Sequence, residues 1–183
     1  MPGKEKSGKV LKNGAKKSRN ALEIICKTND GRLSDLVPIR HSRMLLSPFT
    51  YYRGAAAVMA ADLAAEKNSG IFVQSCGDCH ILNFGAFATP ERNVIIDLND
   101  FDETHPAPFE WDLKRLAASM VLAVASGPLP AALGRAAAYD LACAYQKEIA
   151  AYAEMKLLDI WYSKIDYQHY IDTAVNKAKQ KHL

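Results

Sequence analysis

Residues 76–85 read CGDCHILNFG, and this stretch decides between three incompatible interpretations of the chain. The pattern C-x-x-C-H is typical of covalent haem attachment, and C-x-x-C alone is typical of a redox-active dithiol. Asp78, followed five residues later by Asn83, instead matches the aspartate and asparagine of a phosphoryl-transfer loop. The sequence on either side of the stretch favours the third interpretation.

The surroundings of the two cysteines, Cys76 and Cys79, argue against a haem or thiol-redox site. The flanking segments 71–75 and 84–88 look like strands, whereas haem attachment and a thioredoxin-like dithiol each need a helix at the motif. A zinc site would need further ligands, and no second Cys-x-x-Cys or His pair completes a well-spaced site. We therefore expect no haem and no zinc, and two cysteines buried in a tight turn.

Composition and charge indicate a soluble globular protein. The chain has 183 residues, of which 49% are hydrophobic, so it can bury a substantial core within one domain. Residues 1–19 hold seven Lys or Arg and one acid. Because no aromatic side chains lie between them to stack on bases, we interpret them as a basic, disordered tail and expect no binding to nucleic acid. No stretch suits a membrane span or an export signal, so we expect a cytoplasmic protein.

Hydrophobic periodicity and turn residues predict a mainly helical α+β domain over residues 20–183. One strand is predicted at 71–75, and a hairpin is predicted from 84–88 and 93–97. Residues 98–111 are predicted to form a loop rich in acids and prolines. The predicted helices are 20–31, 34–47, 48–67, 112–126, 131–157 and a lysine-rich helix at the C-terminus.

Oxygen-bearing side chains gather just after the predicted hairpin. Asp97 ends its second strand, and four more follow within seven residues, namely Asn99, Asp100, Asp102 and Glu103. So many carboxylates repel one another unless cations or hydrogen bonds compensate. One or two of them could instead cap the helix that begins near Trp111. The hairpin would bring the others beside Asn83, where a metal ion that bridges phosphates is expected.

Four segments together resemble one bacterial family, the domain of unknown function 2252. They are 76-CGDCHILNFG-85, 95-IIDLNDFDET-104, 110-EWDLKRLAAS-119 and 48-PFTYYRGAAAVMAADLA-64. That family is in turn similar to the aminoglycoside-phosphotransferase branch of the protein-kinase-like fold, in which a G-D-x-H-x-x-N loop precedes an I-D strand end and a D-L helix start. The resemblance implies a kinase-like C-lobe whose small β-hairpin layer carries the catalytic-type loops.

The same resemblance implies roles for individual residues of the loop and its supports. Asp78 corresponds to the catalytic aspartate, and His80 would help to shape the catalytic loop. Asp112 corresponds to an aspartate that supports this loop through hydrogen bonds. Arg53 is a candidate partner for a phosphate of the cofactor or for the acidic loop, because the arginine fork suits both geometries. A helix-surface arginine is the alternative interpretation.

The implied cofactors are Mg²⁺ and ATP, with Asn83 corresponding to the metal-binding asparagine. Two aspartates compete for the second metal position. Spacing favours Asp97, whereas the local sequence Asp100-Phe101-Asp102 resembles the metal-binding D-F-G of protein kinases and favours Asp100. Both alternatives stay open at the level of the sequence.

Two parts of a kinase-like site have no counterpart in the sequence. Residues 1–47 contain no G-x-G-x-x-G, and no predicted strand carries a lysine ahead of the loop. The resemblance therefore suggests an N-terminal portion of a longer protein, with self-association through an apolar surface that would face a missing lobe. The leading hypothesis is a phosphotransferase that moves a phosphoryl or nucleotidyl group from ATP to an unknown acceptor. The alternative is a catalytically silent binding or scaffold module.

Overall fold

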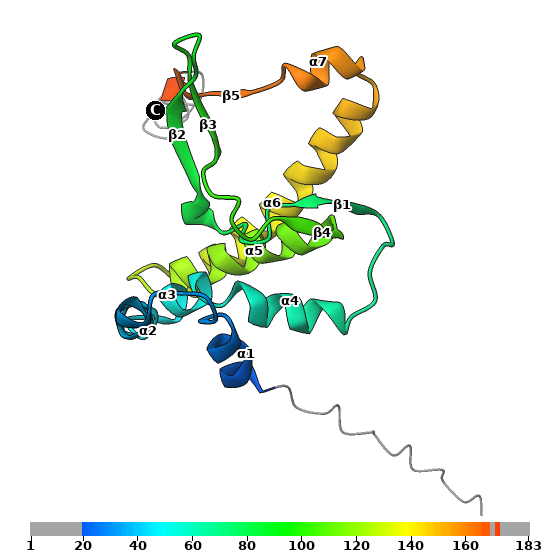
Figure 1. Cartoon of the computed structure of the whole chain (residues 1–183). Coiled ribbons are helices and arrows are strands. Elements are labelled where there is room, and N and C mark those ends of the chain that lie inside the picture. The colour runs from blue at the N-terminus through cyan, green and yellow to red at the C-terminus, as the bar shows by residue number, and fades with distance from the viewer. Residues whose placement is uncertain (1–19, 169–170, 173–183) are drawn as a thin grey trace, which may run out of the picture.

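The protein has the predicted α+β class, and its described part is mainly helical with two small antiparallel sheets (Figure 1). The computed structural model describes residues 20–168 and 171–172. The predicted basic tail, residues 1–19, and most of the predicted C-terminal helix lie outside them. Within the described part, no helix is both long enough and apolar enough to cross a membrane.

Short helices form the N-terminal part of the described chain. They are α1 (Ala21–Lys27), a single 3₁₀ turn η1 (Ser34–Leu36), α2 (Val37–Met44), α3 (Pro48–Arg53) and α4 (Ala56–Ala64). The side chain of Asn20 caps α1, and Ser47 with Thr50 forms a capping box at the start of α3. A small core of buried side chains joins α1, α2 and the start of α4, and it is made of Ile25, Met44, Ala55 and Val58.

The prediction of one helix over 48–67 is wrong, because the chain breaks at Gly54 between α3 and α4. Gly54 lies directly against the side chain of Met44, where an added Cβ would come within 2.6 Å of the Met44 sulfur. The break turns α4 away from α3, so that Ala55 and Val58 reach the core. Local helix propensity was overridden here by packing.

Two pairs of strands carry the loops that matter for the site. β2 (Phe84–Ala88) and β3 (Val94–Leu98) form the predicted hairpin, in which Gly85 lies opposite Asp97. β1 (Phe72–Ser75) pairs with β4 (His105–Pro108), which corrects the prediction of an unbroken loop over 98–111. The two-residue strand β5 (Ile165–Asp166) adds to the free side of β3.

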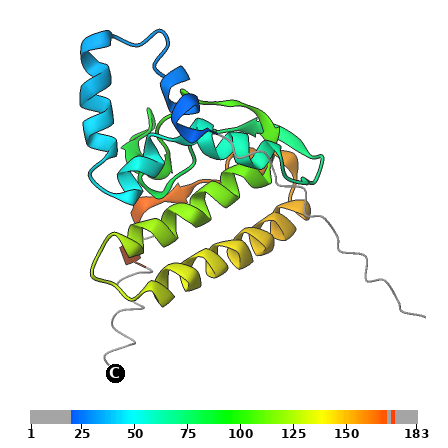
Figure 2. The same cartoon turned by 90° about the horizontal axis from the view of Figure 1, so that it is seen from below.

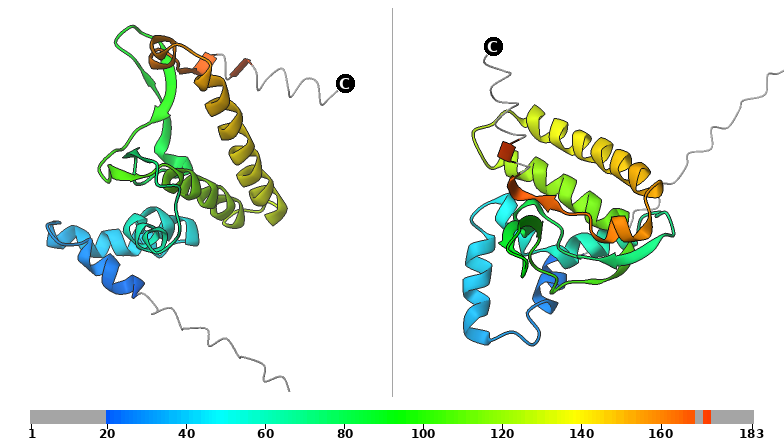
Figure 3. Two further views of the ribbon diagram at one scale, coloured as in Figure 1. Left: turned by 90° about the vertical axis from the view of Figure 1, so that its right-hand side faces the viewer. Right: turned by 90° about the horizontal axis from the view of Figure 1, so that it is seen from above.

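Two long helices form the base of the site. α5 (Glu110–Ala125) and α6 (Ala131–Ala153) lie side by side, and α6 ends earlier than the predicted 131–157 (Figure 2). Gly134 lets them approach closely, since an added Cβ would lie 3.0 Å from the Cα of Val121. The hairpin and α6 extend from one side of α5, and α1 and α2 lie on the other (Figure 3).

Large apolar side chains remain exposed toward the end of the described chain. They include Leu157 and Trp161 in α7 (Leu157–Trp161), with exposed fractions of 83% and 79%, and Ile165 in β5. Contiguous exposed apolar surface commonly marks an interaction site. Self-association through such a surface stays a prediction.

Candidate functional site

The stretch 76–83 is a tight loop between β1 and β2 that ends in one 3₁₀ turn, η2 (Ile81–Asn83). Gly77 has a positive φ of 81°, a conformation that glycine adopts at no steric cost. An added Cβ there would overlap the backbone oxygen of Glu103. The loop therefore requires glycine both for its backbone conformation and for its close approach to the segment before β4.

Asp112, at the start of α5, holds the beginning of this loop. Its Oδ2 accepts a hydrogen bond from the backbone N–H of Cys76 at 2.7 Å, and its Oδ1 accepts one from that of Gly77 at 3.1 Å. Further along the same helix, the hydroxyl of Ser119 accepts a hydrogen bond from the N–H of Ile81 at 2.9 Å. Side chains of α5 thus satisfy backbone donors at both ends of the loop.

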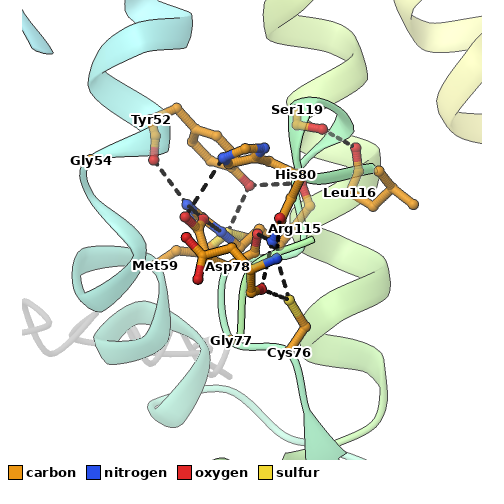
Figure 4. A network of polar contacts seen from close by, with 12 residues as sticks. Tyr52, Gly54, Met59, Cys76, Gly77, Asp78, His80, Arg115, Leu116 and Ser119 are labelled. Carbon is orange, nitrogen blue, oxygen red and sulfur yellow. Dashed lines mark hydrogen bonds and ion pairs between the residues drawn. The ribbon is translucent and has the colours of Figure 1, made fainter. Parts of the chain in front are cut away.

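Arg115 binds the side chain at the centre of the loop, Asp78 (Figure 4). Its Nε donates to Asp78 Oδ1 at 2.8 Å, and its Nη2 donates to the same oxygen. Nη2 also donates to the backbone oxygen of Tyr52 at 3.0 Å, and the guanidinium carbon lies 4.4 Å from the centre of the Tyr52 ring. Only 3% of Arg115 is exposed, so this arginine is buried and paired.

Arg115, Ser119 and Tyr52 were not singled out from the sequence. A signal was available, because Asp112, Arg115 and Ser119 follow the i, i+3, i+7 spacing of one helix face. Beyond them, the second half of this helix is apolar. A polar row on such a helix indicates a buried polar partner, which here is the loop.

The second carboxylate oxygen of Asp78 is left available. Within the described residues Oδ2 accepts no hydrogen bond, and Nε2 of His80 lies 3.6 Å from it. The side chain of Asp78 is 18% exposed and lines a cleft. Asp78 is therefore anchored by one oxygen and can accept a proton or a hydrogen bond with the other.

His80 is a buried imidazole with an unused ring nitrogen. It is 5% exposed, its ring meets that of Phe49 edge-on, and Nδ1 has no hydrogen-bond partner within the described chain. Burial lowers the pKa of His80, outweighing the opposing effect of the Asp78 carboxylate, and the charges of Arg53 and Arg115 lower it further. The imidazole is thus held neutral near neutral pH.

Asn83 joins the loop to the acidic segment after β3. Its amide nitrogen donates to the backbone oxygens of Asp78 at 3.1 Å and of Asp100 at 3.0 Å. Its Oδ1 accepts a hydrogen bond from the N–H of Asp100, also at 3.0 Å. Asn83 is 5% exposed, and one lone pair of Oδ1 remains after these contacts.

The structure separates the two competing aspartates. Asp97 is exposed on β3, where its Oδ1 accepts a hydrogen bond from the N–H of Leu98 at 2.8 Å, and it does not line the cleft. Asp100 lines the cleft beside Asp78 and Asn83, and its Oδ1 accepts a hydrogen bond from the N–H of Asp102. Of the two aspartates, Asp100 is therefore the better-placed candidate for a metal ligand.

A cleft of about 930 Å³ lies between the α2–α3 region on one side and the loop 76–83 with the acidic segment after β3 on the other. It brings together five of the predicted site residues: Arg53, Asp78, His80, Asn83 and Asp100. Asp112 lies behind the loop that it holds, and Asp97 lies outside. The exposed side chain of Arg53 forms no hydrogen bond or ion pair with other described residues.

Negative charge accumulates on the loop side of the cleft. The pKa of Glu103 is raised by desolvation and then by the carboxylates of Asp78, Asp100 and Asp102. Yet within residues 20–168 and 171–172 no three His, Cys, Asp or Glu side chains are grouped to hold a metal ion. A cation here would need other oxygen ligands in addition, such as the Asn83 amide or a bound phosphate.

The cysteines of the stretch have the environment of buried structural thiols. Cys76 and Cys79 are free, with exposed fractions of 4% and 6%. Burial raises the pKa of Cys79 to about 12 and raises that of Cys76 as well. A redox or nucleophilic cysteine needs a lowered pKa and access to solvent, so this environment argues against thiolate chemistry.

Replacing Gly77 by alanine should destabilise the protein more than the same change at Gly31. Both glycines have φ near 80°, but an added Cβ at Gly31 meets no atom within 4 Å. We expect Gly31→Ala to lower the free energy of unfolding by about 1–2 kcal/mol, from the left-handed backbone alone. Gly77→Ala should cost a further ~1–3 kcal/mol from overlap with Glu103. Urea denaturation measures both, and equal losses would contradict the tight loop.

His80 should make the fold less stable as the pH falls. Its folded-state pKa lies below the unfolded value of about 6.5, so below that pH the unfolded chain takes up a proton that the folded protein does not. The free energy of unfolding should therefore fall between pH 7 and 5, by up to about 1.4 kcal/mol per pH unit from this group. His80→Gln should make the fall shallower. An identical pH dependence in the variant would contradict the buried neutral imidazole.

Comparison with known proteins places the chain in a family. The model of the family described as "Uncharacterized protein conserved in bacteria (DUF2252)" matches residues 32–183. No curated protein and no solved structure matches the chain. The relationship to kinase-like phosphotransferases stays a prediction, whereas the resemblance to the bacterial family is confirmed. Because the match spans most of its length, the chain belongs to this family of uncharacterised proteins conserved in bacteria.

Proposed function

We propose that the protein is a kinase-like phosphotransferase that moves a phosphoryl or nucleotidyl group from ATP to an acceptor hydroxyl, with Asp78 as the general base. The observation that carries this proposal is the state of the Asp78 carboxylate. Arg115 holds Oδ1 from behind, and Oδ2 lies at the cleft without a hydrogen bond from the described residues. A base needs this combination of fixed orientation and a free oxygen.

The proposed step is a proton transfer coupled to the displacement at phosphorus. The hydroxyl proton of the acceptor passes to Asp78 Oδ2 while the hydroxyl oxygen bonds to the transferred phosphorus. The bond from that phosphorus to its bridging oxygen breaks, and ADP leaves if the γ-phosphoryl group moves. His80 stays neutral beside Asp78, so it does not compete for the carboxylate as a cation would.

The oxygen donors of the cleft fit Mg²⁺. Asp100 offers a carboxylate and Asn83 offers one lone pair of its amide oxygen, and both line the cleft with Asp78. Mg²⁺ prefers oxygen ligands and commonly takes only one or two protein carboxylates, completing its shell with phosphates and water. When bound, the ion would neutralise charge on the phosphates of the nucleotide.

Arg53 is the proposed contact to a phosphate of ATP. The given sequence has no lysine on a strand ahead of the loop, and Arg53 supplies a cation close to it. Arg53 lines the cleft, and its charge is close enough to lower the pKa of His80. A guanidinium can bind phosphate through two parallel hydrogen bonds.

A catalytically silent scaffold is the second candidate, and one observation favours it. Asn83 and Asp112 have structural hydrogen bonds to the backbone, which bind the loop to the segment after β3 and to α5. These contacts alone would preserve both residues in a protein without catalysis. Nucleotide binding separates the two candidates.

Asp100 and Asp97 provide a matched test of nucleotide binding. Isothermal titration of ATP with Mg²⁺ should show binding by the parent, and Asp100→Asn should weaken it by about tenfold, which corresponds to ~1.4 kcal/mol. Asp97→Asn removes the same charge outside the cleft and should leave the affinity unchanged. A folded parent that binds no Mg·ATP would remove the phosphotransferase proposal and leave the scaffold.

Asp78→Asn should separate binding from turnover. Asparagine keeps an oxygen that can accept the hydrogen bonds of Arg115 but cannot act as a base, so affinity for Mg·ATP should change little. Release of ADP from ATP, with water as the acceptor, should fall at least ~100-fold. Chromatography of the products distinguishes ADP from AMP and so identifies the transferred group. Unchanged turnover in a variant with native circular dichroism would contradict the role of Asp78.

A further inference from the structure

The cleft has a second wall that the proposed chemistry leaves unexplained. Facing the acidic loops, it is lined by Arg32, which precedes η1, and by Arg40 and Arg43 of α2. We call these three residues the arginine wall. With Arg53 they place four guanidinium groups around a cleft whose lining contains two aspartates.

The arginine wall forms no salt bridge among the described residues, although the Glu103 carboxylate acts on Arg32 and Arg40 from a greater distance. No salt bridge joins Arg32, Arg40 or Arg43 to any carboxylate of the described chain. Arg40 is held by neutral acceptors instead, the side chains of Asn29 at 2.7 Å and Thr28 at 3.1 Å and the backbone oxygen of Gly54 at 2.8 Å. Arg40 is therefore held in place by neutral groups, without a salt bridge to a carboxylate.

The charges of the wall also oppose one another. The pKa of Arg40 is lowered by burial and by the positive charge of Arg32, and only Glu103 acts in the other direction. Of the two aspartates in the cleft, Asp78 is already paired with Arg115 behind it. An excess of uncompensated positive charge in a concave site attracts an anion from solution.

Apolar side chains lie between the charged groups of this wall. Leu36, Ile39 and Leu46 line the cleft with exposed fractions of 53%, 47% and 77%, and Leu82 of the loop lines it at 57%. Exposed apolar side chains around fixed polar groups are typical of small-molecule sites, in which the polar groups orient a partly apolar ligand.

We propose that the arginine wall binds the anionic group, a phosphate or a carboxylate, of a ligand whose body is partly apolar. On the proposed function, this ligand is the acceptor. Its anionic end lies at Arg32 and Arg43, and its hydroxyl faces Asp78 across the cleft. Arginine suits this purpose because its planar fork matches the oxygens of both anions. The same wall repels a polycationic acceptor such as an aminoglycoside.

Phenyl phosphate is a suitable probe, because it combines a phosphate with an apolar ring. Titrated calorimetrically in metal-free buffer without nucleotide, it should bind the parent, and Arg43→Gln should weaken binding about tenfold or more. The side chain of Arg43 forms no hydrogen bond with other described residues, so this variant should fold. Arg135→Gln, an exposed change on α6 outside the cleft, is the matched control and should leave affinity unchanged.

Three further ligands define the chemistry of the site. Benzoate replaces the phosphate by a carboxylate, and the tighter of the two anions identifies the preferred group. Phenol keeps the ring without the charge and should not bind detectably, and neither should the polycation kanamycin. Binding of phenol as tight as that of phenyl phosphate would overturn the proposal, as would equal losses in Arg43→Gln and Arg135→Gln.

A last titration, in saturating Mg·ATP, tests the assignment of the ligand as acceptor. Phenyl phosphate should bind with nearly the same affinity as without nucleotide. Competition would place the phosphates of ATP on the arginine wall and would overturn the assignment. Binding of phenyl phosphate by a protein that does not bind Mg·ATP would support the anion site and contradict the phosphotransferase. A protein that binds Mg·ATP but not phenyl phosphate would contradict the anion site and leave the phosphotransferase proposal standing.

Discussion

The buried guanidinium of Arg115 is the interaction on which the site depends. Placing an arginine where 3% of it is exposed costs several kcal/mol unless its charge and its donors are matched. Asp78 supplies the charge, and Tyr52 supplies a backbone acceptor and the face of its ring. One side chain of α5 thus connects the loop with α3, two segments that sequence alone would leave unrelated.

The fold was predictable where its determinants are local. Turn residues located the β2–β3 hairpin, and Ser47-Pro48 marked the start of α3. Errors arose where distant contacts decide. The chain breaks at Gly54, where the side chain of Met44 packs closely, and β4 forms because residues 105–108 meet β1, some thirty residues earlier in the chain. The prolines of β4 led to the prediction of a loop, although proline is tolerated at a sheet edge.

The site was predictable as a set of residues but not as an arrangement. The spacing of Asp78 and Asn83 indicated a shared loop, and the cleft contains both. Spacing favoured Asp97 over Asp100, whereas the hydrogen bonds between Asn83 and the backbone of Asp100 draw the latter to the cleft. The arginine wall could not be predicted from the sequence, because its arginines are separated along the chain. They line one cleft only when α2 and α3 pack beside the loop.

The single helix face that carries Asp112, Arg115 and Ser119 has a mechanical consequence. All three contacts with the loop belong to one rigid rod, so a rotation of α5 about its axis displaces them together. On its other side α5 packs against α6, whose Gly134 lies close to the backbone of Val121. The orientation of the Asp78 carboxylate therefore depends on the placement of α5, which packs against α6.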